Sequence, residues 1–154
     1  MNRRKLAPAN IVILAAGVVM LVATFMPFYK SEANGASVGE ANAWDQGLFL
    51  IATLAALLGV VMALQIGLEA FGNITMPNRM LGLTWDQFHI VLAFQALLLM
   101  LAFLLRKRLD EVIVGTHVQV VLGTGYWLML AGSIALVVGA LMRVAASRRR
   151  PRAI

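Results

Sequence analysis

The chain has 154 residues, of which 61% are hydrophobic and only 13% are charged, and it contains no cysteine. A soluble domain carries about 25% charged residues, so this composition excludes an ordinary soluble protein, and the lack of cysteine excludes disulfides, thiolate metal sites and cysteine nucleophiles. The net charge of +6 would suggest nucleic-acid binding in a soluble protein, but the basic residues cluster at the ends of apolar segments. That placement indicates membrane topology and no nucleic-acid partner.

Four long apolar stretches fill most of the sequence. A helix rises about 1.5 Å per residue, so each stretch is about long enough to cross a hydrocarbon layer of roughly 30 Å. We therefore expect an all-α membrane fold, a four-transmembrane-helix bundle that forms a single domain over residues 1–154. The expected helices cover residues 9–28, 46–71, 85–109 and 123–146.

The first apolar stretch follows Arg3, Arg4 and Lys5 and ends at Pro27 and Phe28. A basic start is also typical of a secretory signal peptide, but such peptides have a shorter apolar core and a small-residue cleavage site. Because this stretch is longer and ends without that pattern, we expect a retained helix.

The basic residues predict the orientation of the chain. Loops rich in Lys and Arg stay cytoplasmic, and basic clusters precede the first helix and follow the last. We expect a bacterial cytoplasmic (plasma) membrane, several crossings and both termini cytoplasmic. Arg79 then lies inside, and the basic trio 106–108 lies outside as an anchor of the third helix. The tryptophans fit an interfacial belt, with Trp85 inside and Trp44 and Trp127 outside.

The second expected helix has a face of small residues. It carries Ala55, Gly59 and Ala63 at four-residue spacing, with Ala52 and Ala56 beside them. Such a face allows another helix backbone to approach closely. We expect a contact within the bundle, and a dedicated dimerisation face is the alternative.

The third expected helix has a defined start and a polar residue in its middle. Thr84 and Gln87 form a capping-box pattern, and Asp86 is favourable at the positive end of the helix dipole. Gln95 lies about ten residues, or roughly 15 Å, into the helix, near the bilayer midplane. We expect its amide to bond a backbone carbonyl or Ser133 of the fourth helix.

Two loops on the outer side carry the remaining structural signals. The first, residues 29–46, contains Asp45, a typical N-cap residue, just before the second helix. The second contains the β-branched run 112–122, which predicts a strand with a partner in the first loop, around residues 28–31 and 36–38. We expect a small extracytoplasmic antiparallel β-sheet that caps the bundle. The alternative is a fourth helix that begins within this run.

Short motifs in these loops carry a resemblance. The first loop contains Asn42-Ala43-Trp44-Asp45, and the strand leads through Gly123-x-Gly125-x-Trp127 into a Gly-rich last helix. Over nearly the whole chain this layout resembles small four-pass membrane proteins of actinobacteria and other high-GC bacteria, which are mostly of unknown function. It is also similar to claudins, which have four helices and two unequal outer loops. The chain lacks the paired loop cysteines of claudins, which argues against a junction-forming role.

Polar side chains near the inner ends of the second and third helices form the candidate site. Burying polar groups in a membrane is costly, so they are default functional candidates. Together they would form a cytoplasmic-side pocket for a cation or a proton relay, and the alternative is a hydrated or arginine-paired group at the membrane interface. The cluster consists of Gln65, Glu69, Arg79, Asp86 and His89.

Neither a cofactor nor a metal is expected. Glu69, Asp86 and His89 have the ligand types of a three-ligand zinc site, but their spacing is not diagnostic. The sequence has two histidines and shows no serine–histidine–acid grouping and no carboxylate pair at depth, so we expect no catalytic residues.

Two further groups would face partners outside the bundle. A basic tail behind the last helix would gain about 1 kcal/mol per residue at an anionic lipid leaflet. The tail consists of Arg148, Arg149, Arg150 and Arg152. The outer-loop candidates for contact with a partner are Trp44, Asp45 and His117.

These features favour a non-enzymatic accessory or scaffold protein that binds another membrane protein or an envelope component through its outer cap and its small-residue faces, with homo-oligomers also possible partners. The alternative is a small transporter or channel-like oligomer with the polar cluster as a cytoplasmic-side gate. A lipid-modifying enzyme would require a polar cleft at the headgroup level, which the sequence does not indicate.

Overall fold

The computed structural model describes residues 7–33, 36–45, 49–71, 82–105, 111–113 and 116–148. It is mostly helical, with a small four-stranded sheet. The helices are α1 (Pro8–Ala23), α2 (Phe49–Phe71), α3 (Trp85–Leu105) and α4 (Thr124–Arg148). The strands are β1 (Tyr29–Ala33), β2 (Ala36–Ala41), β3 (Glu111–Ile113) and β4 (Thr116–Leu122).

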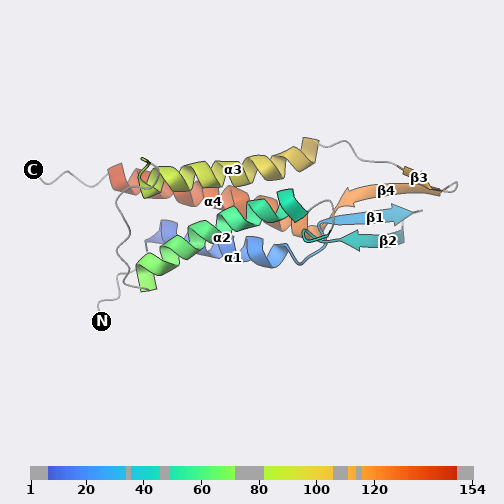
Figure 1. Cartoon of the computed structure of the whole chain (residues 1–154), viewed down its shortest axis with the longest axis horizontal. Coiled ribbons are helices and arrows are strands. Elements are labelled where there is room, and N and C mark those ends of the chain that lie inside the picture. Colours follow the sequence, from blue (N-terminus) through green and yellow to red (C-terminus); the bar gives the residue numbers. More distant parts are fainter. Residues whose placement is uncertain are drawn as a thin grey trace, which may run out of the picture.

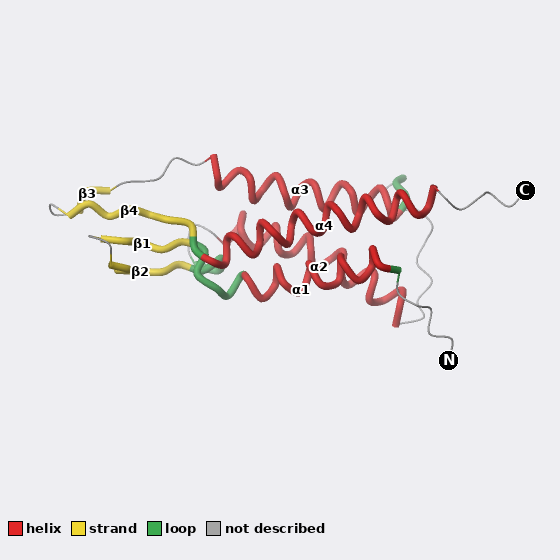
Figure 2. The backbone as a smooth tube through the Cα atoms, turned by 180° about the vertical axis from the view of Figure 1, so that it is seen from behind, coloured by secondary structure: helices red, strands yellow, loops and turns green. Residues whose placement is uncertain are grey.

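The four helices pack as a bundle in which α1 and α3 each lie against both α2 and α4. The sheet extends beyond one end of the bundle, whereas α1 begins and α4 ends at the opposite end (Figures 1 and 2). Within the described part of the chain, three helices are long and apolar enough to cross a membrane, over Leu50–Phe71, Trp85–Leu104 and Thr124–Arg148. α1 is equally apolar in character but shorter, with 16 residues.

The outer surface of the bundle is strongly apolar. Every helix exposes large aliphatic side chains, which include Val18 on α1, Leu64 on α2, Leu98 on α3 and Ile134 on α4. Soluble monomers rarely expose continuous apolar surfaces of this kind. The bundle therefore suits a lipid environment.

α1 ends earlier than the sequence predicted, at Ala23 rather than Phe28. Pro27 explains the difference, because its ring nitrogen has no hydrogen to donate to the Ala23 carbonyl and because a proline disfavours helical backbone in the preceding residue. The Ala23 carbonyl instead accepts a hydrogen bond from the amide of Met26 at 3.2 Å, which closes a tighter turn.

The structure describes the start of α3 but not that of α2. α2 is described from Phe49 onward, and residues 46–48, where a helix capped by Asp45 would start, lie outside the described residues. The Asp45 carboxylate accepts a hydrogen bond from the backbone amide of Asn42 at 2.6 Å. α3 begins with the predicted capping box. The amide of Gln87 donates to Oγ1 of Thr84 at 3.4 Å, and the amide of Thr84 donates to Oε1 of Gln87 at 3.0 Å.

The last two helices lie close to their expected positions. α4 covers Thr124–Arg148, so the alternative of a helix that begins within the β-branched run is wrong. α3 is described as far as Leu105, and its expected last turn lies outside the described residues.

α1 and α4 meet along a seam of alanine and glycine that repeats every seventh residue. The pairs are Ala23 with Gly125, Ala16 with Gly132 and Ala9 with Gly139. A Cβ atom at Gly139 would lie 2.6 Å from Cγ1 of Ile13 and 3.3 Å from the carbonyl oxygen of Ala9. Glycine, which has no side chain, permits this close backbone approach, and small residues are common where helices pack in lipid.

α1 and α2 make a second close crossing, at Gly17 and Gly59. A Cβ at Gly17 would lie 2.8 Å from the carbonyl oxygen of Gly59 and 2.7 Å from Cβ of Ala63. The predicted small-residue face of α2 therefore makes a helix contact inside the bundle. It is not free to bind a partner as a surface of its own.

The sheet has the strand order β2-β1-β4-β3, and all its strand pairs are antiparallel. β1 pairs with β4 from Tyr29 opposite Leu122 to Ala33 opposite Val118. The sequence predicted this pairing between the two loops. It did not predict that the β-branched run would divide into β3 and β4, which pair with each other.

Phe28 joins the sheet to the bundle. Its amide donates to the carbonyl of Ala41 at 2.7 Å, and its carbonyl accepts a hydrogen bond from the amide of Gly123 at 2.8 Å. Its fully buried ring makes edge contacts with Phe103 and Tyr126, with centroids 5.0 and 5.4 Å apart. Three segments that are far apart in the sequence are thus fixed around one aromatic residue.

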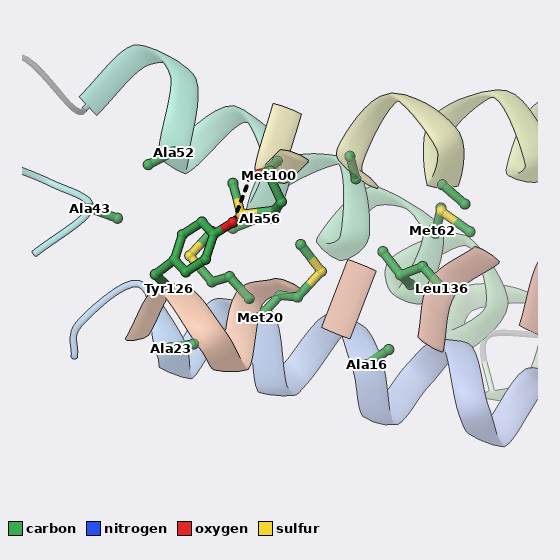
Figure 3. Packing of buried hydrophobic residues seen from close by; sticks show 14 of the residues in the cluster. Ala16, Met20, Ala23, Ala43, Ala52, Ala56, Met62, Met100, Tyr126 and Leu136 are labelled. Atoms are coloured by element: carbon green, nitrogen blue, oxygen red, sulfur yellow. Dashed lines mark hydrogen bonds between the residues drawn. The ribbon is translucent and has the colours of Figure 1, made fainter. Parts of the chain in front are cut away.

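The core of the helix bundle consists mainly of alanine and methionine. Tyr126 is its largest fully buried side chain, and its hydroxyl donates to the carbonyl oxygen of Met100 at 3.0 Å (Figure 3). A buried phenol needs such a partner, and this one links α4 to α3.

Candidate functional site

An ion pair connects α3 and α4 at the bundle end that lies away from the sheet. Nε of Arg143 donates to Oδ1 of Asp86 at 3.1 Å, and their side chains are 15% and 28% exposed. Asp86 lies in the first turn of α3, where the helix dipole also favours a carboxylate. The sequence indicated Asp86 as a site residue, but it did not indicate Arg143 as its partner.

His89 lies one helical turn beyond Asp86 and is fully buried. Neither of its ring nitrogens has a hydrogen-bond partner among the described residues. Its ring lies 6.5 Å from the ring of Trp85, centroid to centroid. An imidazole always carries at least one N–H, so a fully buried histidine without partners is unusual and calls for an explanation.

Gln65 and Glu69 of α2 form a local pair one turn apart. Nε2 of Gln65 donates to Oε1 of Glu69, whereas Oε1 of Gln65 is buried without a partner among the described residues. Gln65 is 5% exposed and Glu69 is exposed at the end of the helix. The pair therefore runs from the interior of the bundle to its surface.

The structure brings only part of the predicted cluster together. Asp86 pairs with Arg143, and Gln65 pairs with Glu69. Arg79, the expected partner in the loop, lies outside the described residues.

The three possible zinc ligands are not assembled. Among the residues with described positions, which include Glu69, Asp86 and His89, no group of three His, Cys, Asp or Glu side chains is placed to hold a metal ion.

This end of the bundle contains buried polar atoms that could bind a ligand because they lack hydrogen-bond partners among the described residues. Both nitrogens of His89, Oε1 of Gln65 and Nη1 of Arg143 are buried without partners in the described part of the chain. Each is a donor or acceptor that a water molecule or a polar ligand would satisfy. Together they come from α2, α3 and α4.

At the other end, Trp44 is anchored to the last turn of α1. Its indole Nε1 donates to Oγ1 of Thr24 at 3.0 Å, and its ring stacks on Phe25 with centroids 5.7 Å apart. Trp44 is nevertheless 40% exposed, as is typical of a residue at a membrane interface. Asp45 is exposed beside it.

The other predicted contact residues are described only in part. The backbone of His117 lies in β4, opposite Val112 of β3. Arg148 is exposed and is the last described residue of α4. The remaining arginines of the tail, Arg149, Arg150 and Arg152, lie outside the described residues.

Gln95 does not lie where the sequence predicted. Its side chain is exposed on the outer surface of α3 and makes no hydrogen bond to any described residue. Ser133, its expected partner, is fully buried and donates to the carbonyl of Leu130 at 2.8 Å. The expectation failed because α3 is apolar on all sides, and its sequence does not reveal which side faces the bundle.

Comparisons of the chain with protein-family models, with curated proteins and with solved structures give no match.

Proposed function

We propose that the chain crosses a bacterial cytoplasmic membrane four times, with both termini in the cytoplasm and the sheet outside. The support is the shared position of the start of α1 and the end of α4, at the end of the bundle that lies away from the sheet (Figure 1). Arg143 and Arg148 lie near that end, in agreement with the preference of basic residues for the cytoplasmic side. α1 crosses as a short helix whose path continues through the turn to Phe28.

We propose that the protein is a non-enzymatic accessory or scaffold subunit, which presents the sheet to another membrane protein or to an envelope component. The observation that carries this proposal is the edge of β2, one of the two outer strands of the sheet. An edge strand has unpaired backbone donors and acceptors, and extended segments of other proteins commonly add to such edges. Ser37, Gly39 and Glu40 are exposed on β2.

The attachment of the sheet to the bundle supports the same proposal. Backbone hydrogen bonds connect both loops to α1 and α4 through Phe28, Ala41 and Gly123. A sheet held this way keeps a fixed position relative to the membrane, which lowers the entropy that a partner must remove on binding. The basic tail would hold the opposite end against anionic lipid.

Photo-crosslinking in living cells tests this function. A photoreactive residue replaces Ser37 or Glu40 on β2, and the matched control replaces Ser147, which is exposed at the far end of α4. We expect a discrete adduct with one partner from both β2 positions and none from position 147. Loss of that adduct in an otherwise folded Glu40→Lys variant would identify the edge as the contact. A protein that gives no adduct from either strand position lacks the proposed function.

A second candidate function is a small transporter or channel-like oligomer with the polar residues as its gate. The observation that favours it is the burial of His89 and Gln65 with unpartnered polar atoms. Intramembrane polar groups often mark pathways for ions or protons. Replacing His89 and Glu69 with apolar residues separates the two functions: partner adducts at β2 persist if the protein is a scaffold, whereas solute flux in proteoliposomes disappears if it is a transporter.

A further inference from the structure

Gln95 lies at the midpoint of α3, about ten residues from either end. At about 1.5 Å per residue, this places its amide roughly 15 Å from both membrane surfaces when α3 spans the bilayer. The side chain points away from the bundle and has no hydrogen bond to any described residue. It is therefore directed into the hydrocarbon layer.

An amide in hydrocarbon needs a partner. Glutamine has two N–H donors and a carbonyl acceptor, and leaving such a group unbonded in an apolar medium costs several kcal/mol. The side chain is too short to reach water from mid-membrane, in contrast to the long basic side chains at helix ends. The partner must come from another molecule at the same depth.

The surroundings of Gln95 form a continuous helix seam. Exposed residues recur along α3 at alternating spacings of four and three: Val91, Gln95, Leu98 and Ala102. This is the period of the seam in a left-handed helix pair, in which a single polar residue fixes register and oligomeric state. α3 also has the smallest share of buried residues among the three long spans, 28% against 44% for α2 and 39% for α4.

The small-residue faces of α2 and α4 are not available as contact surfaces for another molecule. The glycines of α4 are covered by α1, and Gly59 of α2 is covered by Gly17 and Met20. α3 lies against α2 and α4 on its inner side only. Within the described helices, the outer face of α3 is thus a surface on which a polar group at mid-membrane depth remains without a partner.

We propose that two copies of the chain form a parallel dimer through this seam, with Gln95 of one copy bonded to Gln95 of the other. A second copy fits the requirement because it carries the same amide at the same depth and with the same orientation. A twofold axis along the membrane normal brings the two side chains together, and each amide can then both donate and accept. The proposal goes beyond the scaffold function and does not depend on which partner the sheet binds.

Cysteine crosslinking in membranes tests the seam, because the natural chain contains no cysteine. Single variants Val91→Cys, Leu98→Cys and Ala102→Cys are oxidised in vesicles that contain the protein. The matched controls are Leu57→Cys and Leu64→Cys, which place the thiol at comparably exposed positions of α2. We expect disulfide-linked dimers from the α3 variants and not from the α2 controls. Equal crosslinking from both helices would mean random collision and would overturn the dimer.

Gln95→Leu tests the amide itself. Its exposed position allows the substitution without repacking, and retention of the thermal unfolding midpoint in detergent checks that the fold is intact. Energy transfer between labelled copies in liposomes should show dimerisation weakened by about 3- to 30-fold, the range that interhelical polar contacts in membranes support. Gln95→Asn should retain most of the association.

Two further results would contradict the proposal. One is unchanged association in Gln95→Leu. The other is a purified chain that stays monomeric in liposomes while Leu98→Cys crosslinks to a different protein in native membranes. In the second case, a foreign helix occupies the seam, and adducts at β2 would still report the scaffold function independently.

Discussion

Arg143 and Asp86 form an ion pair across α3 and α4 with an Nε–Oδ1 distance of 3.1 Å, although they are 57 positions apart in the chain. Arg143→Met removes the cation and leaves the half-buried carboxylate without its partner. We expect a loss of about 1 to 3 kcal/mol in the free energy of unfolding, measured by reversible denaturation in mixed micelles. The double variant Asp86→Leu/Arg143→Met should recover much of the loss, because two apolar side chains leave no charge unpaired.

The pair between Lys30 and Glu40 is the internal control for this prediction. Its atoms are 3.3 Å apart, but the side chains are 34% and 47% exposed. Water screens such a pair, so Glu40→Gln should change the unfolding free energy by no more than about 0.5 kcal/mol. An equal loss of unfolding free energy in Arg143→Met and Glu40→Gln would show that burial does not make the first ion pair stronger than the second.

Substitutions at glycines should separate the helix seams from open helix surface. Gly17→Ala places a Cβ against the backbone of Gly59, which cannot move aside, so we expect a destabilisation of about 1 to 3 kcal/mol. Gly67→Ala is the matched control, because nothing lies within 4 Å of the added atom. The control should be neutral or stabilising, as alanine favours helix over glycine by about 1 kcal/mol. Thermal unfolding of both variants in the same detergent provides the comparison.

The helices were predictable because long apolar stretches have few other structures in a membrane. The capping box at Thr84 and the strand that ends at Leu122 were also predictable, since their signals are local. α1 ends earlier than its apolar stretch because Pro27 cannot continue the helix, and hydropathy alone does not indicate this end.

The seam between α1 and α4 shows what a sequence leaves open. Gly125 and Gly132 repeat every seventh residue, and so do Ala16 and Ala23, but neither repeat identifies the other as its partner. The same limit applies to the site: Arg143 lies too far along the chain from Asp86 to be paired with it by spacing. The sequence predicted the wrong face for Gln95, because a helix that is apolar on all sides does not indicate which side is buried.

His89 gives a prediction with an unusual sign. Its ring is fully buried and both nitrogens lack partners among the described residues. Burying polar atoms without hydrogen bonds costs free energy, and an apolar side chain of similar size removes that cost. We expect His89→Leu to raise the unfolding temperature, or at least not to lower it, in a differential scanning measurement. A clear destabilisation would mean that the histidine has a partner such as bound water, and would strengthen the transporter function.

The hydrogen bond from Trp44 to Thr24 should control the rigidity of the turn at residues 42–45. Trp44→Phe keeps an aromatic ring beside Phe25 but removes the indole donor to Oγ1 of Thr24. We expect faster hydrogen exchange at the amide of Ala43, which donates to the carbonyl of Thr24 at 3.2 Å. Exchange at α4 serves as the reference, and a uniform increase over the whole chain would indicate general unfolding instead.

The proposed topology underlies every functional statement, and accessibility labelling of single cysteines measures it most directly. Ala7→Cys and Ser147→Cys place thiols at exposed positions at the start of α1 and near the end of α4, and Ser37→Cys places one on β2. In intact cells, a membrane-impermeant maleimide should label position 37 alone, and positions 7 and 147 should react only after permeabilisation. Labelling of position 7 and position 147 from opposite sides of the membrane would contradict four crossings and the account that depends on them.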